Sequence, residues 1–193
     1  IDVTGCGNSL NTATDAAARL VIDSLRYWAR EVHIDGFRFD LAVTLGRDGA
    51  HAFSPDHPLL RAIVDDPALA GVKLIAEPWD VGMDGYQLGA FPEPWSEWND
   101  QYRDCVRDFW RGQGFGVAEL GWRLTGSGDI YWQHSSGTHA SVNFVTAHDG
   151  FTMRDLVTYN HKHNIANREQ NRDGTSNNRS WNCGIEGETR NTQ

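Results

Sequence analysis

The sequence predicts an α/β protein with a parallel sheet, as part of a (β/α)8 barrel. Two observations lead to this fold class. Apolar stretches typical of buried strands alternate along the chain with stretches of helical periodicity. An acidic residue ends three of the predicted strands, at Asp40, Glu77 and Asp149, with one strand–helix unit between the first two and about two units between the last two. In a (β/α)8 barrel such strand ends meet at one rim, where active sites lie.

The first predicted helix follows a loop rich in glycine and asparagine. Thr14 is a candidate N-cap residue at the start of this helix. Apolar residues then recur every three or four positions, at Ala17, Val21, Leu25, Trp28 and Val32. This spacing predicts an amphipathic helix that ends before Gly36.

The strand that follows lies in "HIDGFRFDLA", residues 33–42, and carries two charges on one face. At a period of two, Phe37, Phe39 and Leu41 share one face, and Arg38 and Asp40 share the other. A strand covered on both faces is normally apolar throughout. Two charges in such a strand are costly unless they pair or have a function.

The middle of the chain predicts a helix, a strand and a long loop. The helix covers residues 58–66, and the strand lies in "VKLIAEPW" and ends at Pro78, because proline cannot donate to a sheet. Residues 80–97 are rich in Gly, Pro and Trp and predict a loop, with a short strand near "WSEW".

The last third of the chain predicts one more helix and one more strand. Residues 99–111 have helical spacing, and Gly112 ends this helix. The strand lies in "ASVNFVTAHDG", residues 140–150. The spacing after it permits a helix over residues 151–164, and residues 167–187 predict a polar loop.

Charge and cysteine content exclude several classes of protein. With 17 basic and 26 acidic residues, the net charge of −9 argues against a nucleic-acid partner. No stretch approaches eighteen consecutive apolar residues, so we expect no membrane span. Cys6, Cys105 and Cys183 are far apart and lack C-x-x-C spacing, which favours a reducing compartment such as the cytoplasm. No glycine-rich nucleotide-binding motif occurs.

The sequence gives no support for a metal or another cofactor. His161 and His163 are two residues apart, so they do not share a helix face, and no carboxylate at ligand spacing accompanies them. The stretch "NRDGT" resembles a calcium loop only at its start. We expect these residues to have structural or substrate-loop roles.

Aromatic residues are the other candidates for ligand contact. A sugar ring can stack on an aromatic side chain. The candidates are Trp79, Tyr86, Trp95, Trp98 and Trp132. Core packing is the expectation for at least half of them.

Three motifs, "GFRFDLA", "LIAEPWD" and "FVTAHDG", in this order, resemble characteristic segments of the α-amylase family of glycoside hydrolases. The sequence around these motifs is similar to that of the bacterial glycogen debranching enzymes, relatives of isoamylase. The stretches that carry this similarity are "HIDGFRFDLA", "WNDQYRDCVRDFWRG", "RLTGSGDIY" and "YNHKHNIANREQNRDGTSNNRSWNCGIEG". The resemblance covers essentially the whole chain.

The resemblance implies roles for three carboxylates. Asp40 would be the nucleophile of a retaining glycosidase, and Glu77 the general acid and base. Glu77 would need a raised pKa, which we expect from an apolar environment beside Trp79. Asp149 would stabilise the oxocarbenium-like transition state. A solvated glutamate at a strand end remains the alternative for Glu77 taken alone.

The resemblance also implies substrate-binding roles for three neighbours of the carboxylates. Arg38 would keep Asp40 ionised by pairing with it, and the alternative is a purely structural ion pair. His148 would donate a hydrogen bond to the same sugar, although a strand-end "HD" pair is weak support by itself. Trp79 would contact the substrate.

The activity implied is hydrolysis of α-1,6 branch linkages in glycogen or limit dextrin, with retention of configuration and a branched α-glucan as the partner. Two alternatives stay open. One is an α-1,4-acting amylase or a trehalose-forming relative, which would share the three carboxylates. The other is a non-catalytic glucan-binding barrel.

The family has an earlier strand segment that supplies an aspartate and a histidine, and no counterpart of this segment occurs in the chain. The chain opens with Ile1 and closes on "GETRNTQ". We therefore expect residues 1–193 to form a partial catalytic barrel domain, about strands four to seven, cut from a longer enzyme. Such a piece would be inactive alone and prone to self-association through exposed sheet edges.

Overall fold

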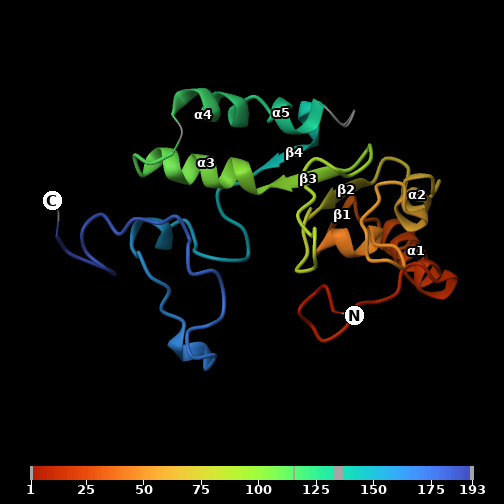
Figure 1. Cartoon of the computed structure of the whole chain (residues 1–193), viewed down its shortest axis with the longest axis horizontal. Helices are drawn as coiled ribbons and strands as arrows, with labels where there is room; N and C mark the ends of the chain where they lie inside the picture. Colours follow the sequence, from red (N-terminus) through yellow and green to blue (C-terminus); the bar gives the residue numbers. More distant parts are fainter. Residues whose placement is uncertain (1, 115, 133–136, 192–193) are drawn as a thin grey trace. The chain divides into compact units, whose positions relative to one another are not determined.

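The computed structural model describes residues 2–114, 116–132 and 137–191 (Figure 1). In this part of the chain a sheet of four strands has the order β1-β2-β3-β4. The strands are β1 (Gly36–Phe39), β2 (Lys73–Ala76), β3 (Ser96–Asn99) and β4 (Ser141–Asn143). Strand β2 pairs in parallel with both β1 and β3. The predicted α/β class with a parallel sheet is confirmed for these three strands.

Helices form at residues 15–30, 58–64 and 100–110, as the sequence predicts, and within the described residues no helix separates β2 from β3. The α-helices are α1 (Asp15–Arg30), α2 (Pro58–Val64), α3 (Asp100–Trp110), α4 (Val117–Leu124) and α5 (Gly128–Tyr131). Short 3-10 helices are η1 (Ala42–Gly46), η3 (Thr138–Ala140), η4 (Asp155–Val157) and η5 (Ile165–Asn167). Helices α4 and α5 were not predicted from the sequence. Both are short, and glycines at or near their ends and inside α4 obscure their periodicity.

The chain divides into two compact units. The first comprises Ile1–Trp98 and Gly126–Val142, and the second Asn99–Thr125 and Asn143–Gln193. In the first unit, Phe37 and Phe39 of β1 pair in register with Leu74 and Ala76 of β2. The side chains of these four residues therefore share one face of the sheet.

Helices α1 and α2 and the 3-10 helix η1 cover this apolar face of the sheet. Their buried contributions to the core are Ile22, Leu25, Ala42, Val43, Leu59, Leu60 and Ile63. Because this face is filled by apolar side chains, the charged residues of β1 and β2 lie on the opposite face. The sheet thus has an apolar side and a polar side, as the period of two predicts.

The start and end of α1 differ from the prediction. Thr14 occupies the N-cap position, but its side chain makes no capping bond and instead donates to the carbonyl of Asn11 at 2.9 Å. The helix ends at Arg30, and Trp28 and Val32 are 47% and 44% exposed. The buried core residues of α1, Ile22 and Leu25, therefore lie nearer its middle than the predicted Trp28 and Val32.

The prediction of a helix over residues 151–164 is wrong. Only one 3-10 turn, η4, forms there, because backbone groups of this segment bond to residues far along the chain. The carbonyl of Leu156 accepts from the N–H of Trp181 at 2.9 Å, and that of Thr158 accepts from the N–H of Gly187 at 2.9 Å. The predicted strand over residues 140–150 is also shorter, at Ser141–Asn143.

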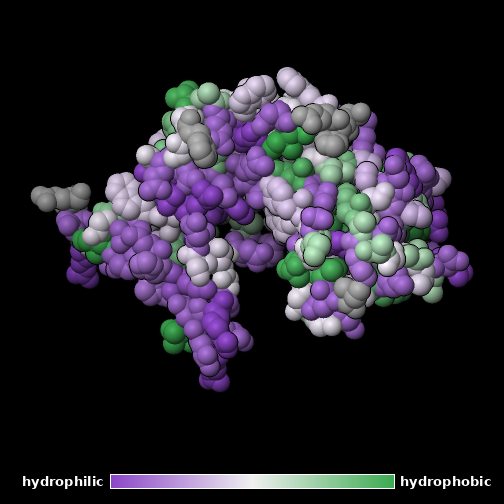
Figure 2. Space-filling view, viewed as in Figure 1, coloured by the Kyte–Doolittle hydropathy of each residue, from purple (hydrophilic) through white to green (hydrophobic). Residues whose placement is uncertain are grey.

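Apart from Asn167, the last residue of η5, residues 167–187 contain no strand and no helix, as predicted for a polar loop. Figure 2 shows mostly hydrophilic residues on the segment that Figure 1 draws in blue.

The cysteines Cys6, Cys105 and Cys183 are free thiols. Within the described ranges, no helix combines the length and the apolar character that crossing a bilayer requires.

One acidic side chain lies on the apolar side of the sheet. Glu97 of β3 is fully buried and accepts hydrogen bonds from the N–H groups of Gly89 at 2.6 Å and Phe91 at 3.2 Å. Burial raises the pKa of Glu97 to about 7, and the two N–H donors offset only part of this effect. Glu97 therefore keeps its proton in the folded protein at a pH where the unfolded chain has released it.

This difference predicts that Glu97 makes the protein less stable as the pH rises from about 4.5 to about 7. The folded pKa lies above the unfolded one, so the contribution is fully present below the unfolded value and is lost as the pH rises through the folded value. We expect the free energy of unfolding in urea of the natural protein, minus that of Glu97→Gln, to fall by about 3 kcal/mol between pH 4 and pH 8. A difference independent of pH would contradict this assignment.

Candidate active site

The guanidinium of Arg38 joins the carboxylates of Asp40 and Glu77. These two acids directly follow β1 and β2, whose last residues, Phe39 and Ala76, are paired in register. Arg38 Nη1 donates to Asp40 Oδ1 at 2.6 Å, and Arg38 Nη2 lies 2.8 Å from Glu77 Oε1. The structure therefore brings three of the predicted site residues together, and the predicted Arg38–Asp40 pair is confirmed.

The two carboxylates lie in different surroundings. The side chain of Glu77 is 6% exposed, whereas that of Asp40 is 70% exposed. Glu77 Oε2 accepts the N–H of Leu41 at 2.8 Å, so both oxygens of the buried carboxylate have a partner. The carboxylate of Glu77 is thus enclosed by protein, and that of Asp40 faces solvent.

Burial raises the pKa of Glu77 above its ordinary value. The repulsion from Asp40 and a hydrogen bond with it act in the same direction, while the N–H of Leu41 and the charge of Arg38 lower the pKa. The direction agrees with the prediction from sequence. Removal from water is the main cause.

Leu41 departs from the predicted strand pattern. The strand ends at Phe39, and Leu41 has a left-handed backbone with φ of 42° instead of sharing a strand face with Phe37. Such a conformation costs a leucine about 1–3 kcal/mol. It starts the 3-10 helix η1 and directs the N–H of Leu41 to Glu77.

Trp98 supports the Arg38 side chain. The guanidinium carbon of Arg38 lies 4.4 Å from the centroid of the Trp98 ring, in the range of a cation–π interaction. The register pairs Ala76 with Glu97, so Trp98 is level with Glu77 on the neighbouring strand. Trp98 was predicted to stack on a sugar, and its contact with Arg38 was not predicted. The alternation of side chains along the strands could have indicated it, because Trp98 and Glu77 lie on the same face of the sheet.

A buried ion pair holds the loop that follows Glu77. Arg47 Nε donates to Asp80 Oδ2 and Arg47 Nη2 to Asp80 Oδ1, both at 2.7 Å, and their side chains are 6% and 0% exposed. Arg47 Nη2 also donates to the carbonyl of Met83 at 2.9 Å. Trp79 pairs with Tyr86 in an isolated β-bridge in this loop. Arg47 and Asp80 are 33 residues apart along the chain, so no local sequence pattern predicts their pairing.

The aromatic candidates divide by exposure. Trp95 is 1% exposed and packs in the core, so it is not available as a sugar platform. Tyr86 and Trp132 are 51% and 65% exposed, and Trp79 is partly buried. Core packing was expected for at least half of the five candidates, and this expectation is wrong, because Trp95 is the one of them in the buried core.

His148 and Asp149 lie in the second unit, and the prediction that Asp149 ends its strand is wrong, because β4 ends at Asn143 and a loop carries both residues. Their side chains are 55% and 80% exposed, and His148 Nε2 lies 3.3 Å from Asp149 Oδ2. Gly150 follows with φ of 76°, a left-handed conformation that glycine adopts readily, at a bend of the chain. The convergence of Asp149 with Asp40 and Glu77 stays a prediction.

His161 and His163 contact the same glutamate. Glu186 Oε1 accepts the N–H of His161 at 3.0 Å and lies 2.9 Å from Nε2 of His163. Hydrogen bonds from the N–H of Asn160 and from His163 are the largest causes that lower the pKa of Glu186 to about 2. Both histidines therefore have a structural role, because they bond to Glu186 of the polar loop.

Known proteins with similar sequences include glycogen operon proteins and glycogen debranching enzymes. No family model matches the sequence. A "Glycogen operon protein GlgX homolog" of Mycobacterium tuberculosis is 57% identical over 188 residues, which cover 97% of this chain and 26% of the relative. A glycogen debranching enzyme of Enterobacter sp. is 53% identical over 184 residues, which cover 95% of this chain and 28% of that protein. The chain resembles the bacterial glycogen debranching enzymes over nearly its whole length, and it spans about a quarter of the length of these relatives.

Solved structures of pullulanases share the fold. The pullulanase from Bacillus acidopullulyticus superposes with a TM-score of 0.63 and 27% identity, over 80% of this chain and 20% of that one. A pullulanase from Anoxybacillus sp. LM18-11, solved with maltotetraose, has a TM-score of 0.56 and 25% identity, over 80% and 23% of the two chains. These neighbours and the parallel sheet support an α/β fold of the α-amylase type.

The site geometry predicts opposite effects of two substitutions on Glu77. Arg38→Gln removes a nearby positive charge and should raise the pKa of Glu77 further, whereas Asp40→Asn removes a negative charge and should lower it. NMR titration of the Glu77 side-chain carboxyl carbon measures both. Shifts in the same direction in the two variants would show that Arg38 and Asp40 do not act on Glu77 through their charges.

Proposed function

We propose that this chain is a catalytic segment of a glycoside hydrolase that cleaves α-1,6 branch linkages of glycogen or limit dextrin. The proposal starts from the resemblance to glycogen debranching enzymes over nearly the whole chain. The observation that carries it is the pairing of one arginine, Arg38, with two strand-end carboxylates, Asp40 and Glu77, in different environments.

The proposed reaction has two steps and retains the configuration of the sugar. In the first, Asp40 attacks the anomeric carbon, Glu77 gives its proton to the leaving glycosidic oxygen, and a covalent glycosyl-enzyme forms. In the second, Glu77 takes a proton from water, and this water attacks the anomeric carbon and releases Asp40. Asp149 would stabilise the positive charge that develops on the sugar ring, and His148 and Trp79 would contact the substrate.

The environments of the two acids suit these roles. Burial favours the protonated form of Glu77, which a general acid needs. Asp40 is exposed, where a substrate can reach it, and the guanidinium of Arg38 fixes the direction of its side chain. The Leu41 N–H and Trp98 hold Glu77 and Arg38 in place.

We further propose that residues 1–193 correspond to about strands four to seven of a (β/α)8 barrel and form a partial catalytic domain of a longer cytoplasmic enzyme. The coverage of the relatives, near one quarter of their length, supports this placement. The partner would be a branched α-glucan. Self-association through sheet edges would apply to the isolated piece.

The alternative activities are an α-1,4-acting amylase, a trehalose-forming enzyme and a glucan-binding barrel without catalysis. The comparison that separates the first two from debranching uses the complete enzyme on two substrates. Release of linear chains from amylopectin, with little hydrolysis of linear amylose, supports α-1,6 specificity. Faster hydrolysis of linear amylose would overturn it.

Replacement of Glu77 separates catalysis from binding. In the complete enzyme, Glu77→Gln keeps the shape of the side chain but cannot donate an acidic proton, so we expect kcat on amylopectin to fall by about 10²- to 10⁴-fold. Glucan binding, measured by affinity electrophoresis, should persist. The matched control is Glu31→Gln, an exposed glutamate at the end of α1. A folded Glu77→Gln enzyme that keeps more than a tenth of its activity would exclude Glu77 as the general acid.

The raised pKa of Glu77 predicts the alkaline side of the pH–rate profile. Because the general acid must hold its proton, kcat/KM should decline as the pH rises through the pKa of Glu77, at a pH above the ordinary glutamate value. The measurement is initial rate against pH at constant ionic strength. A profile that stays flat on its alkaline side would contradict this role.

A further inference from the structure

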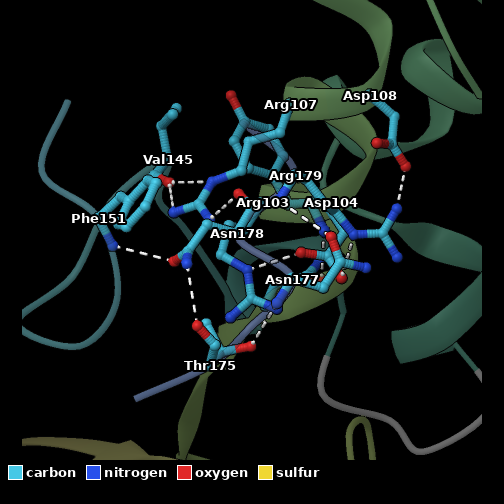
Figure 3. Close-up of polar contacts among 12 residues, drawn as sticks. Arg103, Asp104, Arg107, Asp108, Val145, Phe151, Thr175, Asn177, Asn178 and Arg179 are labelled. Carbon is cyan, nitrogen blue, oxygen red and sulfur yellow. Dashed lines mark hydrogen bonds and ion pairs between the residues drawn. The ribbon is translucent and has the colours of Figure 1, made fainter. Parts of the chain in front are cut away.

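The segment from Val145 to Phe151, which carries His148 and Asp149, is held at its first residue by Arg107 of α3. Figure 3 shows this contact. Arg107 is 8% exposed, and its Nε and Nη2 donate to the carbonyl of Val145 at 2.9 and 2.6 Å. Two donors of one planar side chain thus fix one backbone oxygen.

Asn178 holds the other end of the same segment. This side chain is 4% exposed, and its Oδ1 accepts the N–H of Phe151 at 3.0 Å, while its Nδ2 donates to the carbonyl of Thr175 at 3.0 Å (Figure 3). A Cβ atom at Gly150 would lie 2.9 Å from Asn178 Oδ1. Asn178 therefore lies against the residue next to Asp149 as well as bonding to Phe151.

The two contacts are joined to each other. Arg107 Nη1 donates to the carbonyl of Asn178 at 3.0 Å, so Val145, Arg107, Asn178 and Phe151 form one connected hydrogen-bonded set. Burial lowers the pKa of Arg107 to about 10, with a further contribution from the nearby charge of Arg103. A charged group is thus removed from water to bond backbone carbonyls, an arrangement that fixes geometry at a cost in solvation.

We propose that Arg107 and Asn178 are positioning residues for Asp149 in the hydrolysis proposed above. The side chain of Asp149 is 80% exposed, so its direction depends chiefly on the backbone that carries it. That backbone is fixed at both ends by the connected pair, within a segment that is otherwise a loop. The inference rests on the proposed function.

The first test uses Asn178→Ala in the complete enzyme. This variant removes the acceptor for the Phe151 N–H and keeps the backbone carbonyl that Arg107 uses. We expect kcat on amylopectin, counted per active site, to fall by about 10- to 100-fold, because small misplacements of a catalytic group have effects of this size. KM should change by less than about threefold, and hydrogen exchange of the Phe151 amide should become faster.

Two further variants at this place serve as controls. Asn177→Ala changes an exposed neighbour whose side chain bonds the N–H of Arg179, and kcat should stay within about twofold. Asn178→Asp keeps an oxygen for the Phe151 N–H and should retain kcat within about threefold. Equal losses in Asn178→Asp and Asn178→Ala, or no loss in either, would overturn the inference.

Arg107→Lys tests the other end of the segment independently, and it decides the question if Asn178→Ala does not fold. A lysine keeps the positive charge but lacks the planar fork. The expected result is a loss in kcat of about tenfold or more with little change in KM, and an unchanged kcat would overturn the inference. If the natural enzyme itself shows no debranching activity, the proposed function fails, and the exchange rate of the Phe151 amide in Asn178→Ala still reports whether Asn178 holds the segment.

Discussion

The polar side of the first unit depends on one positive charge, the guanidinium of Arg38. Two carboxylates follow neighbouring parallel strands at the same level, and without a cation between them they would repel each other, one of them from a buried position. Arg38 bonds to both, and its planar face lies over Trp98. The ion pairs and the cation–π contact together stabilise the charged groups on one face of the sheet. The other face, to which Phe37 and Phe39 on either side of Arg38 point, is apolar.

The same arrangement makes two chemically similar acids different. The register of β1 and β2 puts Asp40 and Glu77 at one level, and the left-handed turn at Leu41 then gives Glu77 a backbone donor while Asp40 stays exposed. Burial opposes ionisation of Glu77, while the N–H of Leu41 and Arg38 limit this effect. A reaction that needs one protonated and one ionised carboxyl group depends on this asymmetry.

Helices and strands that depend on local apolar periodicity could be predicted from the sequence. Structure that depends on contacts between residues far apart along the chain could not. The parallel sheet, the helices at residues 58–64 and 100–110 and the strand-end positions of Asp40 and Glu77 follow from apolar spacing. The helix expected over residues 151–164 fails because backbone groups there bond to Trp181 and Gly187. The Arg47–Asp80 pair and the contacts of Arg107 join residues at least 33 positions apart, which no local pattern reveals.

The contacts that the sequence did not reveal have a common physical form. The loop after β2 is held by the buried Arg47, which donates to Asp80 and to the carbonyl of Met83. The segment after β4 is held by the buried Arg107, which donates to the carbonyls of Val145 and Asn178. Loops after strands have few backbone partners of their own, so their shape needs donors from elsewhere. The guanidinium supplies several donors in one rigid plane and stays charged when buried, which lysine does not do as well. Catalytic side chains borne on loops require such supports, because their reacting atoms must be held within a fraction of an ångström.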